Sequence, residues 1–224
     1  MAIILSIETS TSVCSAALHK DDQLLAVQEL HTRQSAGAQL TTLIEQIITD
    51  AKVSKSEIDA VAVASGPGSY TGLRIGVATA KGLCFGLGVP LIAIDSLLIL
   101  ASSVNNTIST DLLCPMIDAR RMEVYCSLLT PSLDIVEPTH ARIIDSESFN
   151  AQLAIHSISF FGDGAEKCRS ILKGENAVFP EGIFISAQNM GKLAFQKFQT
   201  KQFEDLTAFE PNYLKEFVAK TKLK

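Results

Sequence analysis

Residues 60–76 read AVAVASGPGSYTGLRIG and place a β-type run, a glycine-rich turn and a helix start in direct succession. Gly66 and Gly68 permit a sharp turn at this point. Ser69 or Thr71 can cap the helix that follows, because a side-chain hydroxyl oxygen accepts a free N–H of the first helical turn. The segment therefore predicts a unit in which a loop leads directly from a strand into a helix.

This turn is also the first candidate for a ligand site. The free N–H groups of a helix start attract anions, and loops of this kind occur in nucleotide-handling proteins. The turn is not a Walker loop, since no Gly-Lys-Ser/Thr follows it, and its glycine spacing differs from that of the dinucleotide fingerprint. An anion site and a plain helix-start turn both remain open. The residues of the candidate anion site are Gly66, Gly68, Ser69, Thr71, Gly72 and Arg74.

The predicted elements occur in the same order in both halves of the chain. The predictions rest on β-branched runs, a hairpin turn at residues 20–22 and an apolar helical stripe over residues 36–51. In the first half, strands are predicted at residues 2–8, 12–18, 23–30, 60–64 and 91–94, with helices at 36–51 and 71–86. In the second half, strands are predicted at 112–117, 123–129, 134–143 and 157–161, with helices at 146–154, 165–172 and 187–198.

Two details indicate a duplication. Glu8 and Asp118 each end a strand just before a hairpin, and Gly66-Pro67-Gly68 in the first half matches Gly162-Asp163-Gly164 in the second. Three hairpin-linked strands followed by a helix, a strand and a helix form the ribonuclease-H-like layout. Two such units make an actin-like, sugar-kinase-like α/β architecture with a ligand cleft between them. We expect subdomains at residues 1–104 and 105–224, with the last helix able to pack back on the first subdomain.

Composition narrows the function classes. The chain has 224 residues, of which 47% are hydrophobic, so it can form a sizeable core. Its apolar runs are too short for a transmembrane helix, and its start resembles a first strand rather than a signal peptide. Five cysteines without a Cys-x-x-Cys pair predict buried thiols in a cytoplasmic protein. The net charge of −5 argues against a broad nucleic-acid surface, and the basic cluster of Lys215, Lys220, Lys222 and Lys224 is interpreted as a solvated tail.

Several motifs along nearly the whole chain resemble the TsaB family, also called YeaZ, of bacterial tRNA threonylcarbamoyladenosine biosynthesis proteins. The segment at 66–76 is the most specific of them, whereas the tail motif is weak alone. The motifs are LSIETS at 5–10, CSAAL at 14–18, the segment at 66–76, AKGL at 80–83, IDARRMEVY at 117–125, GDGA at 162–165 and PNYLK at 211–215.

The resemblance implies a function as a partner subunit. It implies a non-catalytic partner of the TsaD enzyme, whose complex transfers a threonylcarbamoyl group to N6 of the adenosine next to the tRNA anticodon. A TsaE-like ATPase is the third protein of this bacterial modification system. The chain is expected to contact tRNA mainly through its complex with TsaD. The chain departs from the family in having Glu8 where most members have Asp, and in lacking a common histidine near Ala36. The longer side chain of Glu8 shifts its carboxylate, so no metal- or phosphate-orienting role is transferred to it.

An independent catalytic activity is not expected. Catalytic relatives hold a metal with a His-x-x-x-His pair, and no two of His19, His31, His140 and His156 have that spacing. All four histidines are predicted to lie at the surface or in loops. The chain is therefore expected to have no peptidase activity, no metal site and no required cofactor.

Glu8 and Asp118 are the candidate carboxylates of the cleft. They can face one another and bind a cation, or they can bond loop amides, which is the favoured interpretation. Arg74, Arg120 and Arg121 can meet phosphate, but structural ion pairs are the commoner role of such residues. The alternative function, from a different class, is a small ATP-dependent phosphotransferase or ATPase of the actin-like class. The first hairpin lacks the glycine that such enzymes use there.

The second predicted helix is a candidate partner surface. Gly72, Gly76 and Ala80 are spaced by four, and a stripe of small residues lets another helix approach closely. In the resembling family, the first two helices form a bundle with TsaD, or with a second copy of TsaB when TsaD is absent. The candidate interface residues are Leu40, Leu43, Ile47, Leu73, Gly76, Val77 and Ala80.

Overall fold

The computed structural model of the protein describes residues 1–31, 36–104 and 108–214. They form two five-stranded sheets with the same strand order, β3-β2-β1-β4-β5 and β8-β7-β6-β9-β10. This correspondence confirms the repeated plan. The expected subdomain boundary at Asn105-Asn106 lies outside the described residues. The strands are β1 (Ile3–Glu8), β2 (Cys14–Lys20), β3 (Gln23–Leu30), β4 (Ala60–Gly66), β5 (Leu91–Asp95), β6 (Leu112–Asp118), β7 (Glu123–Leu129), β8 (Ile135–Ile143), β9 (Ile158–Phe161) and β10 (Ala177–Val178).

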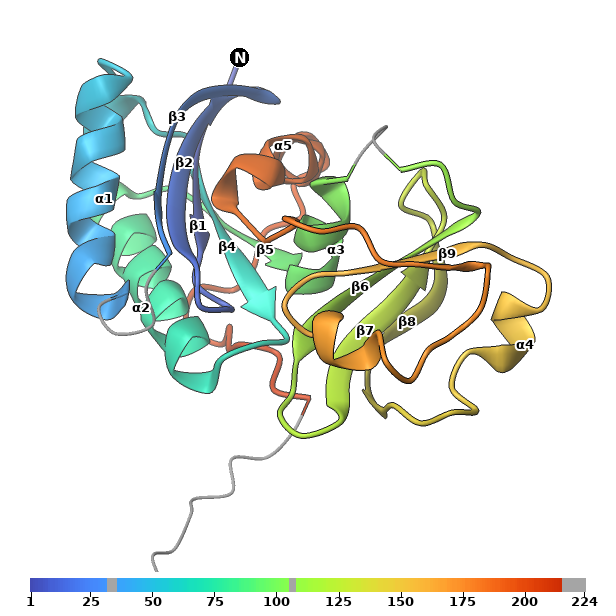
Figure 1. Ribbon diagram of the computed structural model, residues 1–224. Helices are drawn as coiled ribbons and strands as arrows, with labels where there is room; N and C mark the ends of the chain where they lie inside the picture. The colour runs from blue at the N-terminus through green and yellow to red at the C-terminus, as the bar shows by residue number, and fades with distance from the viewer. Residues whose placement is uncertain (32–35, 105–107, 215–224) are drawn as a thin grey trace, which may run out of the picture.

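The helices form two layers around the first sheet (Figure 1). Two long helices, α1 (Ala36–Asp50) and α2 (Tyr70–Leu87), cover its outer face, while α3 (Ser96–Ser102) and α5 (Gly191–Gln199) lie between the two sheets. The short α4 (Asn150–Leu153) lies at the far side of the second half. One hydrophobic core joins the facing sides of the sheets through α3 and α5, and each outer face has a core of its own. Because α5 contacts β1, β2, β3 and β5, the last helix of the described residues packs on the first sheet.

The second half has shorter helices than the sequence predicts. The predicted helix at 146–154 is limited to α4, because Phe149 just before it adopts a left-handed φ of 64°. The helix predicted at 165–172 is wrong: only a 3₁₀-turn, Glu166–Cys168, forms there. The helix predicted at 187–198 begins with a 3₁₀-turn, Ala187–Met190, before α5.

Helix α3 was not predicted, because the apolar residues of α3 continue those of β5 with little interruption. Asp95 was the available signal, since its carboxylate caps α3 by accepting the N–H groups of Leu97 and Leu98 at 2.8 and 3.1 Å. No helix among the described residues is long and apolar enough to cross a membrane. All five cysteines are buried and free, as predicted.

His19 contradicts the prediction of a surface histidine. It lies in β2 with 1% of its surface exposed, because the segment that enters α5 covers this face of the sheet. Its Nε2 is 3.0 Å from the Gln188 carbonyl oxygen, and its Nδ1 is 3.4 Å from the Ser6 hydroxyl. Burial lowers the pKa of the His19 imidazole.

Candidate functional site

The glycine-rich loop joins β4 to α2 and uses its own backbone donors. Ser69 is the N-cap of α2, and its side chain accepts the Gly72 N–H at 3.3 Å, which confirms Ser69 rather than Thr71 as the cap. The Ser69 N–H donates to the Ser10 carbonyl at 2.6 Å, and the Leu73 N–H donates to the Ser69 carbonyl at 2.9 Å. The N–H groups of Ser69 and Gly72 are therefore bonded within the protein, and the Leu73 N–H makes the first i→i−4 hydrogen bond of α2.

The glycines of this loop lie directly against the turn between β1 and β2. A Cβ atom at Gly68 would collide with the Ser10 carbonyl, and one at Gly72 with the Thr9 carbonyl. Gly66 has a left-handed φ of 104°, and a Cβ there would lie 2.7 Å from the Asn212 carbonyl oxygen. This tight packing supports the interpretation of the loop as a structural turn.

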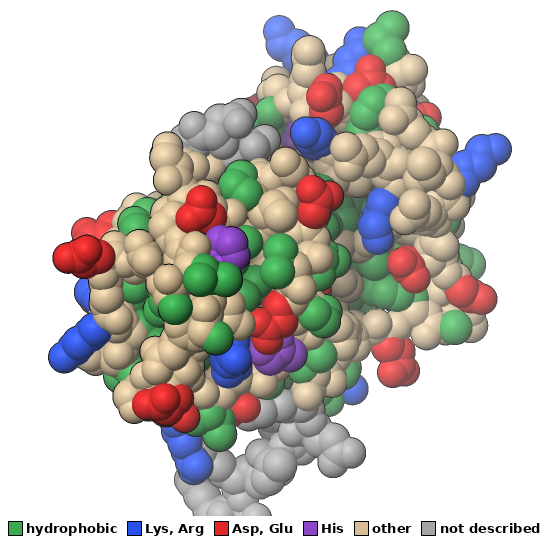
Figure 2. All heavy atoms as spheres, turned by 90° about the vertical axis from the view of Figure 1, so that its right-hand side faces the viewer, with side chains coloured by type: hydrophobic (Ala, Val, Ile, Leu, Met, Phe, Trp, Pro, Cys, Tyr) green, Lys and Arg blue, Asp and Glu red, His purple; other side chains and the backbone are tan. Residues whose placement is uncertain are grey.

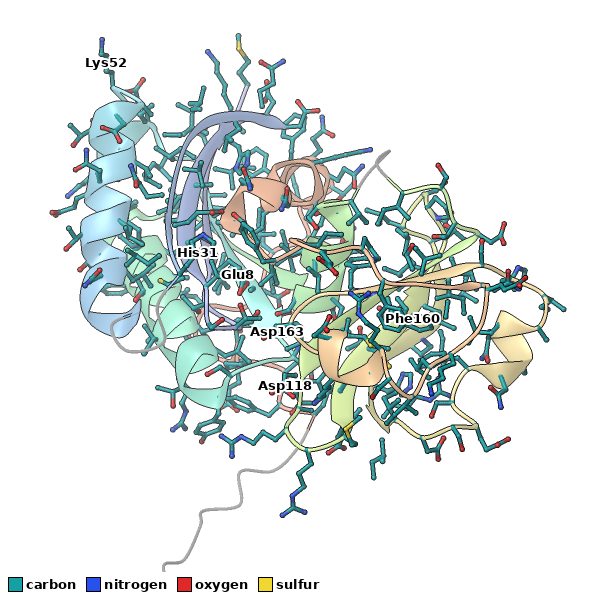
Figure 3. The ribbon with its side chains drawn as sticks, viewed as in Figure 1. Glu8, His31, Lys52, Asp118, Phe160 and Asp163 are labelled. Carbon is teal, nitrogen blue, oxygen red and sulfur yellow. The ribbon has the colours of Figure 1, made fainter. Side chains whose placement is uncertain are left out.

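Glu8 ends β1 in the centre of the molecule and is fully buried (Figure 3). Its carboxylate accepts a short hydrogen bond from the Ser10 N–H and a second from the Ser10 hydroxyl at 3.2 Å. Burial raises the pKa of Glu8 to about 7 against the lowering effect of these bonds, and the negative charge of Asp163 raises it further. The favoured role of Glu8 as an acceptor for loop groups is thus present in the structure.

The second carboxylate facing Glu8 comes from a different residue than expected. Asp118 ends β6 with 46% of its side chain exposed, and it forms an ion pair with Lys167. The charge that acts on Glu8 is that of Asp163, whose carboxylate accepts the Asp118 N–H at 3.0 Å. Asp163 lies in the second glycine-rich turn, Gly162-Asp163-Gly164, and was not among the predicted site residues. Within the described ranges, no group of three His, Cys, Asp or Glu residues is arranged to hold a metal ion.

Six of the seven candidate interface residues are buried within this chain, which corrects that prediction. Only Leu43 is partly exposed, while the others are buried against the chain's own residues. Gly76 approaches Thr9 so closely that a Cβ would collide with its hydroxyl oxygen. The buried residues are Leu40, Ile47, Leu73, Gly76, Val77 and Ala80.

The opposite side of α2 carries the exposed small residues. Ala78 and Gly82 are exposed and line a mostly apolar groove of about 310 Å³ between α1 and α2. Thr41 and Glu45 border the same groove from α1. One helical turn beyond Gly82, the side chain of Phe85 is 84% exposed. The stripe that an external helix can approach therefore runs through residues 78, 82 and 85 rather than 72, 76 and 80.

Comparisons with known proteins agree on one group of relatives. The family model described as "TsaD: tRNA N6-adenosine threonylcarbamoyltransferase" matches residues 30–223. The Escherichia coli K12 "tRNA threonylcarbamoyladenosine biosynthesis protein TsaB" is 30% identical over 98% of this chain and 97% of its own length. The Bacillus subtilis protein of the same name is 34% identical over 56% of this chain and 54% of its own length. The structure of YeaZ from Pseudomonas aeruginosa superimposes with a TM-score of 0.83 and 23% identity, covering 96% of this chain and all of that one.

Proposed function

The chain belongs to the TsaB family, and on this basis we propose that it is the non-catalytic partner subunit of a TsaD-like transferase. Its relatives in E. coli and B. subtilis are proteins of tRNA threonylcarbamoyladenosine biosynthesis, and this chain takes part in the same modification. The TsaD-like subunit carries out the transfer to N6 of the adenosine, and this chain positions and activates it. A TsaE-like ATPase acts together with this chain and the TsaD-like subunit.

The chemistry of the central site supports a non-catalytic role. A carboxylate that binds a cation or a phosphate-bound metal needs open access, whereas Glu8 is fully buried and bonded to Ser10. A phosphate-binding loop needs free backbone donors, whereas the N–H groups of Ser69 and Gly72 are engaged within the chain. For the chain to act as an ATP-dependent phosphotransferase or ATPase, both the burial of Glu8 and the hydrogen bonds of the loop N–H groups would have to change.

The groove between α1 and α2 is the main structural observation that supports the role of a partner subunit. It is apolar, and the exposed Phe85 beside it is the kind of aromatic anchor that contributes most to protein–protein interfaces. The small side chains at Ala78 and Gly82 permit a partner helix to approach the α2 backbone. On the opposite side of the molecule, hydrophobic side chains lie in small groups among charged and polar ones (Figure 2). We propose that the groove binds a helix pair of the TsaD-like subunit, or a second copy of this chain when that subunit is absent.

A reconstitution assay tests the function. The TsaD-like subunit, the TsaE-like ATPase, the threonylcarbamoyl-adenylate donor and unmodified tRNA are combined with and without this chain. Nucleoside mass spectrometry then measures threonylcarbamoyladenosine. We expect modification to depend on this chain and the chain alone to modify no tRNA. Equal modification without the chain, or modification by the chain alone, would contradict the proposal.

We expect Phe85→Glu to weaken binding of the TsaD-like subunit by at least about tenfold, because it places a charge in an apolar interface. Gly82→Leu is expected to act in the same direction by filling the groove. Ile155→Glu is the matched control, since Ile155 is also an exposed hydrophobic residue, at 74%, but lies in the second half. Sedimentation velocity measures the complex, and circular dichroism checks the fold. An equal loss of binding to the TsaD-like subunit in Phe85→Glu and Ile155→Glu would show that the groove is not part of the interface.

A further inference from the structure

The described arginines divide into two groups by their partners. Arg142 lies 3.7 Å from a Glu137 oxygen, and Arg169 pairs with Glu166 and Glu181 at 3.1 and 3.2 Å. Arg74, Arg120 and Arg121 are exposed and form no ion pair within the described part of the chain. These three guanidinium groups therefore remain available to an anionic partner.

The three arginines come from segments that end at one edge of the molecule. Arg74 is in the first turns of α2, and Arg120 and Arg121 form the turn between β6 and β7. In Figure 1, the start of α2, this turn and the end of the described C-terminal segment all lie at the lower edge. The Asn212 N–H donates to the Ser65 carbonyl at 2.7 Å, which fixes the C-terminal segment beside the glycine-rich loop.

Aromatic rings accompany these charges. The Arg74 guanidinium lies 4.7 Å from the centre of the Tyr70 ring, and Tyr70 lies 4.8 Å from Tyr213. Guanidinium and aromatic planes are the surfaces on which unpaired RNA bases stack. We call Arg74, Arg120, Arg121, Tyr70 and Tyr213 together the arginine edge.

In the turn between β6 and β7, two arginines adopt a left-handed backbone conformation that other residue types adopt more readily. Arg120 and Arg121 have left-handed φ values of 72° and 52°, where glycine or asparagine is more usual. The neighbouring Asp118 is already paired with Lys167. Asp118 also accepts the Arg120 backbone N–H at 3.0 Å, so the backbone of Arg120, and not its guanidinium group, makes this contact within the turn.

We propose that the arginine edge binds the phosphate backbone and unpaired bases of RNA. The proposal rests on the function proposed above, since the substrate of the modification is a tRNA. In a chain with a net charge of −5, such a confined cationic edge directs an anionic polymer to one place.

Fluorescence anisotropy with a labelled anticodon stem–loop RNA tests the edge, using the full chain alone and bound to the TsaD-like subunit. The double variant Arg120→Asn with Arg121→Gly removes both charges and suits the left-handed backbone. Its control is Lys52→Gly with Lys201→Asn, which removes two exposed lysines with φ values of 55° and 54°. Lys52 lies at the far end of α1 (Figure 3), and Lys201 precedes Glu204, which pairs with the start of β5.

We expect the arginine variant to bind RNA about tenfold more weakly near 0.15 M salt, and its log–log salt slope to fall by about 1.4, which corresponds to two lost phosphate contacts. The lysine control is expected to keep the wild-type slope. Unchanged RNA binding in the arginine variant, an equal loss in the control, or equal competition by polyglutamate would each overturn the proposal. Sedimentation with the TsaD-like subunit is measured in parallel, so that a failure of partner binding is recognised separately from a failure of RNA binding.

Discussion

Gly72→Ala and Gly76→Ala are each expected to lower the free energy of unfolding by about 2 kcal/mol or more. An added Cβ would collide with the Thr9 carbonyl oxygen at Gly72 and with the Thr9 hydroxyl oxygen at Gly76. Thr9 is 2% exposed, and its hydroxyl donates to the Gly72 carbonyl at 2.8 Å, so it has little room to move. The helix must therefore shift away from the turn between β1 and β2.

Gly82→Ala provides the matched control on the same helix. A Cβ at Gly82 meets nothing within 4 Å, and alanine is favoured over glycine within a helix by about 1 kcal/mol. We therefore expect this variant to be more stable than the wild type. Urea unfolding monitored by circular dichroism gives all three free energies. Stabilisation at all three positions would show that helix propensity, rather than contact with Thr9, controls stability here.

Glu8→Gln is expected to raise the free energy of unfolding by roughly 3 kcal/mol at pH 8, since each unit of pKa shift corresponds to about 1.4 kcal/mol. The folded protein holds the Glu8 proton up to a pKa of about 7, whereas the ordinary pKa of a glutamate side chain is 4.5. Between these two values the folded state binds more protons, so the contribution of Glu8 to stability decreases as the pH rises. Above pH 7 the wild type must bury a charged carboxylate beside Asp163, and the glutamine variant avoids this cost.

The pH dependence distinguishes this effect from a general change in packing. At pH 4, where Glu8 is mostly protonated in both states, the two proteins are expected to differ little in stability. The exposed Glu175 provides a control, because Glu175→Gln is expected to change stability by a similarly small amount at both pH values. Urea unfolding at pH 4 and pH 8 makes the comparison. A stability difference between wild type and Glu8→Gln that stays constant with pH would show that folding does not shift the pKa of Glu8.

The glycine variants of α2 also test which side of this helix binds the partner subunit. If the 72–76–80 stripe formed the interface, substitutions there would weaken assembly without unfolding the protein. The structure instead predicts that Gly76 affects folding and that Gly82 affects assembly, because Gly76 packs against Thr9 whereas Gly82 lines the exposed groove. Measuring stability and partner binding on both variants separates the two roles.

Local sequence patterns were sufficient for most strands and the two long helices of the first half of the fold. The strand, turn and helix around the glycine-rich loop, the cap at Ser69 and the hairpins depend on neighbouring residues, and the structure confirms them. The repeated order of elements was also readable, because each half contains the same succession of strand and helix patterns. Short helices such as α3 were less predictable, since a few apolar residues after a strand fit either structure.

Contacts between segments distant in the sequence determined which side of α2 is exposed, whether His19 is buried and how the pKa of Glu8 is shifted. A small-residue stripe has the same spacing whether it faces the chain's own strands or a partner, so only the tertiary structure showed that Gly76 faces Thr9 and Gly82 faces outward. The burial of His19 depends on a segment about 170 residues later in the chain, and the pKa of Glu8 depends on Asp163 in the other half. Periodicity identifies which residues share a face, but it does not identify what covers that face, because that is determined by segments far away in the sequence.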